Sequence, residues 1–157
     1  MEEVIINLKD IHLDLDDDVI VGLKGTDGIT LYEIYRIGPN SMILYNSIGT
    51  WHHGLQMTSM KKWHRRYDLK GHNFIATALE EAPFINKIVL NSVTEKYEMD
   101  GSFVDLLNLL ADIMNFTYTW KLPPDNSWGG LQKDGSWNGM IKLLIDEDAD
   151  FCKITFF

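Results

Sequence analysis

The stretch from Asp100 to Trp120, "DGSFVDLLNLLADIMNFTYTW", constrains the fold most, because its hydrophobic period changes once and abruptly. From Phe116 to Trp120, aromatic residues alternate with threonines, which is typical of a β-strand. Before that, apolar residues recur three and four positions apart, which is typical of one helix face: Phe103, Leu106, Leu107, Leu110, Ile113 and Met114. The sequence therefore predicts a helix over Ser102–Met114, with Leu106, Leu107 and Leu110 buried, and then a strand. Ser102 and Asp105 have the spacing of a capping box at its start.

Alternating patterns flank this helix on both sides. Upstream, "HNFIATALEEAPF" alternates and then breaks at Pro83, which predicts a strand near Phe74–Leu79. Downstream, "DGSWNGMI" leads into an apolar run, so a second helix is expected from Gly139, with Asn138 as N-cap accepting a backbone N–H of the first turn. The end, "DADFCKITFF", alternates again as a strand. The order strand, helix, strand, helix, strand predicts an α/β fold whose first two strands pair in parallel.

The amino-terminal third is expected to be rich in β-structure. "ITLYEIYRI" and "SMILYNSI" contain many β-branched and aromatic residues, and the "GPN" between them predicts a hairpin. The acidic run Asp14–Asp18 is interpreted as a solvated turn. It lacks the glycine and glutamate that a calcium loop needs at its sixth and twelfth positions.

Composition excludes several classes of function. A net charge of −9 argues against a nucleic-acid partner, and the one dense basic stretch, Lys61–Lys70, is too short to reverse this. Cys152 is the only cysteine, which excludes a cysteine-based zinc site, and the five histidines are interpreted as surface residues. No metal and no cofactor are expected. No apolar run approaches the roughly 20 residues that span a bilayer, and the aromatic strand at the end predicts that the chain is truncated.

Three segments, taken in order, resemble the first half of the ligand-binding domain of ionotropic glutamate receptors: "LKGHNFIATALEEAPF", "DGSFVDLLNLLADIMNFTYTW" and "DGSWNGMIKLLIDEDADF". In that family a strand ending in Glu-x-Pro-aromatic precedes a Gly-aromatic-x-x-Asp-Leu helix. A Phe-x-Tyr strand, Trp-Asn-Gly-Met and a helix ending in Ala-Asp follow. The resemblance implies lobe 1, incomplete, of a bilobed periplasmic-binding-protein-like clamshell, preceded by a short β-rich segment. Trp137 is then expected to close the end of the sheet.

The upstream part, "LYEIYRI…ILYNSIGTWHHGLQ…WHRRYDLKG", is similar to the join between the amino-terminal region and the ligand-binding domain. The similarity is greatest to the arthropod chemosensory branch, the ionotropic receptors. The expected division is therefore residues 1–55 as the β-rich end of the amino-terminal region and residues 56–157 as the truncated lobe 1.

The resemblance also implies where a ligand binds. Glu81 matches an acidic residue that helps to bridge the closed lobes, although a solvated strand-end glutamate is an alternative. Met99 stands where glutamate-binding members have an aromatic residue. Thr155, Phe156 and Phe157 stand where those members have Pro-Leu-Thr, which holds an amino-acid ligand. These departures predict that neither glutamate nor glycine is the ligand. Asn115 begins a glycosylation sequon, which is also common by chance.

The function implied is that of a ligand-gated ion channel, in which closure of the clamshell on a small extracellular ligand gates a cation pore outside this chain. The implied partners are the ligand and other subunits of a tetramer, in the plasma membrane, with this segment extracellular. One alternative is a free solute-binding protein with no channel. Another is an enzyme that uses Glu80 with Glu81, or Asp146 to Asp148, as paired carboxylates. No nucleophile, base or phosphate loop accompanies them, so no catalytic residue is expected.

Overall fold

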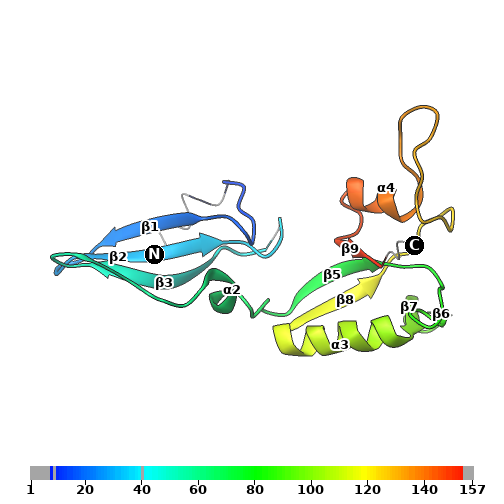
Figure 1. Cartoon of the computed structure of the whole chain (residues 1–157), viewed down its shortest axis with the longest axis horizontal. Helices are drawn as coiled ribbons and strands as arrows, with labels where there is room; N and C mark the ends of the chain where they lie inside the picture. The colour runs from blue at the N-terminus through cyan, green and yellow to red at the C-terminus, as the bar shows by residue number, and fades with distance from the viewer. Residues whose placement is uncertain (1–7, 9, 40, 154–157) are drawn as a thin grey trace. The chain divides into compact units, whose positions relative to one another are not determined.

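The computed structural model describes residues 8, 10–39 and 41–153, and the chain divides into two compact units between Leu69 and Lys70 (Figure 1). The first unit holds an antiparallel sheet in the order β1-β2-β3-β4. The strands of this unit and its short helix α2 have these bounds: β1 Val19–Lys24, β2 Ile29–Tyr35, β3 Leu44–Trp51, β4 Leu55–Met57 and α2 Lys62–Arg65. The predicted hairpin is confirmed as β2 and β3. The flanking strands β1 and β4 were not predicted.

A buried carboxylate organises the polar centre of the first unit. Glu33 on β2 is 2% exposed and accepts hydrogen bonds from Arg65 at 2.6 and 2.9 Å, from Arg66 at 3.1 Å and from Asn46 at 2.9 Å. The Arg66 guanidinium also lies 4.4 Å from the centre of the Tyr35 ring. The two arginines therefore fasten α2 and the residue after it to the sheet through one carboxylate.

The second unit contains the predicted parallel sheet, in the order β8-β5-β9. Phe74 lies opposite Tyr118, and Ala76 lies opposite Phe151, both in parallel register. Figure 1 shows α3 on one side of this sheet and α4 on the other. The bounds are β5 His72–Thr77, β6 Lys87–Asn91, β7 Lys96–Asp100, α3 Ser102–Met114, β8 Phe116–Trp120, α4 Gly139–Ile145 and β9 Phe151–Cys152. The strand-helix order is confirmed, whereas the β6–β7 hairpin inserted before α3 was not predicted.

The expected buried face of α3 is partly wrong. Leu107 is buried as predicted, but Leu106 is 51% and Leu110 is 40% exposed. The helix contacts β7 and β8, and its second buried residue is Val104, which belongs to a core cluster with Ala78 and Ile85. The helix is therefore turned so that Val104 and Leu107, rather than the longer leucine stripe, face the strands.

Both predicted caps are also wrong in detail. Gly101 is the N-cap of α3, and the Ser102 hydroxyl donates to the carbonyl of Pro83 at 3.2 Å instead of capping the helix. At α4, Asn138 is the N-cap residue, but its side chain accepts from the backbone N–H of Gly130 at 2.7 Å. The carboxylate of Asp125, from the preceding loop, accepts the N–H of Gly139 at 3.1 Å.

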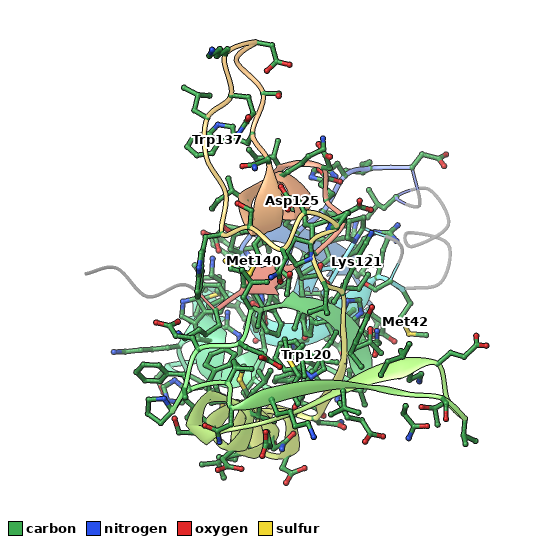
Figure 2. The ribbon with its side chains drawn as sticks, turned by 90° about the vertical axis from the view of Figure 1, so that its right-hand side faces the viewer. Met42, Trp120, Lys121, Asp125, Trp137 and Met140 are labelled. Atoms are coloured by element: carbon green, nitrogen blue, oxygen red, sulfur yellow. The ribbon has the colours of Figure 1, made fainter. Side chains whose placement is uncertain are left out.

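Trp137 does not close the end of the sheet. Figure 2 shows it on the projecting loop that precedes α4, away from Met140. It is 40% exposed and pairs through its backbone with Leu131 across the loop. The base of this loop is tight: Gly139 has φ of +65°, and a Cβ there would lie 2.3 Å from the carbonyl oxygen of Ser127.

Candidate functional site at the strand ends

The carboxyl ends of β5, β8 and β9 meet at one edge of the sheet, because the three strands run parallel. In open α/β sheets this edge is where ligands bind. Glu81 follows β5, Lys121 follows β8 and Lys153 follows β9. Figure 2 labels Trp120 and Lys121 at the end of β8. The edge brings Glu81 and Lys153 into contact from segments far apart in the sequence, whereas Lys121 pairs with Asp148.

Four residues form what we call the strand-end cluster: Glu81, Phe84, Trp128 and Lys153. The Lys153 ammonium donates to Oε2 of Glu81, and their side chains are only 6% and 18% exposed. The same ammonium lies 4.3 Å from the centre of the Phe84 ring and 5.6 Å from that of Trp128. A cation within about 6 Å of a ring face is attracted by the ring quadrupole. Lys153 is thus held by one carboxylate and two aromatic rings.

The backbone fixes the members of this cluster. Lys153 donates its N–H to the carbonyl of Thr77 at 3.1 Å, which extends the pairing of β9 with β5 by one residue. Glu81 and Phe84 lie in one tight turn, in which the Phe84 N–H donates to the Glu81 carbonyl at 2.9 Å. Trp128 is held at the base of the loop, where its carbonyl accepts from Ile141 at 3.3 Å. The rings and the carboxylate are therefore positioned by the fold before any ligand arrives.

A separate groove of about 680 Å³ lies between the hairpin, α3 and β8. Met99 and Val104 line it, together with Tyr118, whose hydroxyl donates to Asn108 at 2.6 Å. Burial raises the pKa of Tyr118 above its ordinary value of 10.0. The groove combines apolar side chains with charged ones, because Glu95, Lys96, Glu98 and Lys121 also line it.

The residues predicted as ligand contacts do not all lie together. Glu81 belongs to the strand-end cluster, whereas Met99 lines the groove and packs against the core cluster of Ala78, Ile85 and Val104. Thr155, Phe156 and Phe157 fall outside the described residues. Asn115 is exposed in a left-handed conformation with φ of +54° at the end of α3. The ligand roles and the glycosylation stay predictions.

Sequence reasoning missed Lys153, Phe84 and Trp128. The available signal was Lys153 itself, a lone basic residue inside the apolar stretch "DFCKITFF". A lysine in such a stretch, once buried, requires a partner. The partner lies 72 positions away, at Glu81, and local patterns give no access to that pairing.

Among the residues that the structure describes, no group of three or more histidines, cysteines or acidic residues is placed to hold a metal ion. Within the same residues, no helix combines the length and apolar character needed to cross a membrane.

Comparison with known proteins gives one family. Residues 72–155 match the family model described as "Ligated ion channel L-glutamate- and glycine-binding site". The human protein "Glutamate receptor ionotropic, kainate 1" is 31% identical over 150 residues, which is 90% of this chain and 15% of that protein. "Ionotropic receptor 25a" of Drosophila melanogaster is 29% identical over 123 residues, covering 74% of this chain and 12% of that protein.

Among solved structures, the glycine complex of an ionotropic glutamate receptor ligand-binding domain from Pleurobrachia bachei is 29% identical, with a TM-score of 0.44. That match covers 52% of this chain and 32% of the solved chain. The matched family is one of ligand-gated channels and not of enzymes. The family model covers more than half of the sequence, including β5, α3, β8 and α4. The chain therefore belongs to the ionotropic glutamate receptor family and contains part of one lobe of its ligand-binding domain.

Proposed function

We propose that this chain is part of a chemosensory ligand-gated cation channel, in which it supplies much of lobe 1 of the clamshell. A small extracellular ligand binds between lobe 1 and a second lobe, and the closed clamshell favours the open pore. A ligand shifts the equilibrium toward the closed clamshell only by the difference between its affinities for the closed and the open clamshell. The similarity to the Drosophila ionotropic receptor supports the chemosensory branch.

The observation that carries this proposal is the strand-end cluster, within the segment that matches the family model. Fixed charge and aromatic surface lie at the carboxyl edge of a parallel sheet, which is the position from which a ligand between two lobes is contacted. Glu81 is the residue assigned to the ligand side of lobe 1. Thr155, Phe156 and Phe157 are assigned to the same surface by the sequence resemblance.

The ligand is proposed to be neither glutamate nor glycine. Met99, which lines the separate groove, replaces the aromatic residue of the glutamate-binding members, and Phe156 and Phe157 replace their leucine and threonine. The two phenylalanines offer only apolar contacts, and a zwitterion loses solvation against them without gaining polar partners from them. A less polar or differently charged chemical cue fits this surface better.

The proposal also assigns the parts of the receptor outside lobe 1 and the location of this segment. The chain spans about 15% of the length of the human relative, so the pore, the second lobe and the partner subunits of a tetramer are assigned by analogy alone. Residues 1–55 are assigned to the end of the amino-terminal region, residues 56–157 to the ligand-binding domain, and the segment to the extracellular side of the plasma membrane. Asn115 is assigned as its glycosylation site, and its exposed position is compatible with that.

The test is electrical recording from cells that express the complete receptor containing this chain. We expect inward cation current with at least one less polar or differently charged small compound, and none with glutamate or glycine. Calorimetric titration of the complete ligand-binding domain with glutamate is the matched binding assay, and micromolar binding there would contradict the ligand assignment. A secreted product that binds a ligand but produces no current would favour the alternative, a free solute-binding protein.

A further inference from the structure

The surroundings of Lys153 match those of a bound ammonium ion. A carboxylate oxygen of Glu81 accepts from the ammonium, and two ring faces lie within 4.3 and 5.6 Å of it. One carboxylate with two aromatic faces is the arrangement by which proteins hold alkylammonium groups of ligands. In this chain the group that fills the site belongs to the protein itself.

We propose that Lys153 is an internal ammonium that occupies the cation site of Glu81, Phe84 and Trp128, and that the receptor is consequently specific for ligands without an ammonium group. The filled cation site stands on the geometry alone. The statement about ligands rests on the proposed function.

Competition explains why a filled site excludes amines. A free ammonium ligand must displace a group that the chain holds at the site permanently, and a tethered group has an effective concentration in the millimolar range or above. The incoming cation is also repelled by the Lys153 ammonium, and the Glu81 carboxylate that would attract it is already paired with that ammonium. Amino acids and amines are therefore disfavoured at this edge, whereas carboxylic acids and neutral compounds are not.

The strand-end cluster keeps its charged group inside and its aromatic rings toward solvent. The side chain of Lys153 is 6% exposed, whereas Phe84 and Trp128 are 40% and 37% exposed. The ammonium thus lies behind the rings, and the outer ring surfaces remain available for an uncharged part of a ligand. Removing the ammonium should open a pocket in which the carboxylate and both rings are ready for an external cation.

Chemical rescue tests the filled site directly. In the 157-residue chain, Lys153→Ala should lower the melting temperature, and methylammonium or propylammonium chloride should restore it in a concentration-dependent way. Sodium chloride at equal ionic strength controls for screening. Wild-type chain should not respond beyond this control, and the double variant Lys153→Ala with Glu81→Gln should lose the rescue. Lys121→Ala is the matched control, because that lysine also follows a strand and pairs with Asp148 at 2.8 Å, yet is 42% exposed.

A second measurement decides the matter if Lys153→Ala does not fold. Reductive methylation of the wild-type chain, followed by mass spectrometry, should modify Lys153 far more slowly than Lys121. Glu81→Gln should accelerate the reaction at Lys153 at least severalfold and leave Lys121 unchanged. Equal rates at the two lysines, or an alanine variant that folds but shows no rescue, would overturn the proposal.

The complete receptor tests specificity. Lys153→Ala should gain a response to, or a block by, an alkylammonium compound, with at least a tenfold change in effective concentration. A wild-type receptor that responds to amines, with Lys153→Ala unchanged, would contradict the specificity. If no compound gives current, the channel proposal fails, and the rescue and methylation results still decide whether the cation site is filled.

Discussion

The charge cluster of the first unit should make its stability depend on pH. Burial alone would raise the pKa of Glu33, but hydrogen bonds from Arg65, Asn46 and Arg66 and the charge of Arg66 outweigh it and lower the pKa from 4.5 to about 2. At about 1.4 kcal/mol per unit, this difference corresponds to roughly 3 kcal/mol of folding free energy. Because the pKa is depressed in the folded state, this stabilisation is fully present above pH about 4.5. It is lost as the pH falls through about 2.

Replacing the carboxylate should remove that dependence. Glu33→Gln should lower the free energy of unfolding of the first unit at pH 7 by about 3 kcal/mol, since it also leaves two guanidinium groups without their anion. The difference between variant and wild type should shrink between pH 4.5 and 2. Amide hydrogen exchange over Ile29–Tyr35, compared between the two proteins at each pH, reports this unit separately from the second.

Asp16→Asn is the matched control, because it makes the same acid-to-amide change at an exposed position of the same unit. It should leave both the exchange rates and their pH dependence nearly unchanged. If Glu33→Gln retained the wild-type pH dependence, or cost no more than Asp16→Asn, the role assigned to the Glu33 carboxylate would be refuted.

Three further predictions concern the second unit, each measured by thermal or urea unfolding. Leu107→Ala should lower the free energy of unfolding by about 2–5 kcal/mol, because it truncates a core side chain. Leu106→Ala should lower it by less than about 1 kcal/mol, because that side chain is half exposed. Equal costs would contradict the observed buried face of α3. Gly139→Ala should lower the free energy of unfolding clearly more than Gly135→Ala. Both glycines have positive φ, but only at Gly139 would a Cβ meet backbone atoms. Similar costs would show that the backbone at the loop base can shift to accept a side chain. Thr77→Val should be neutral or stabilising by about 1 kcal/mol, because the buried Thr77 hydroxyl finds no hydrogen-bond partner among the described residues. A loss of more than about 1 kcal/mol of unfolding free energy would show that this hydroxyl has a partner.

The parts of the fold that sequence patterns predicted well are bounded by residues that start or end a helix or strand. Helix α3 begins and ends where it was expected, because Gly101 precedes it and Asn115 ends it in a left-handed conformation. Strand β8 follows directly with strict alternation, and the change of period marks its start. The β6–β7 hairpin lacked such signals, since "KIVLN" and "KYEMD" are short and mixed in polarity.

Features that depend on contacts between distant segments were not accessible from the sequence. Exposure of Leu106 and Leu110 would by itself count against the lobe assignment, yet the parallel register of β5 with β8 and the family match carry more weight. The helical period located α3 but not its rotation about its own axis, which the packing of Val104 decides. The pairing of Lys153 with Glu81 likewise depends on the alignment of two strands.

The closed base of the loop before α4 has a consequence for how this region can change in evolution. Its two ends are joined by the Asp125 carboxylate on the Gly139 N–H at 3.1 Å and by the Ser127 carbonyl on the Met140 N–H at 3.0 Å. The tip around Lys133 to Gly135 is exposed, and a Cβ at Gly135 would meet nothing within 4 Å. Doubling the length of a loop whose ends are already held costs only about 0.6 kcal/mol. Insertions, deletions or an affinity tag at this tip should therefore be tolerated, and homologous receptors can diversify it without disturbing the sheet that carries the strand-end cluster.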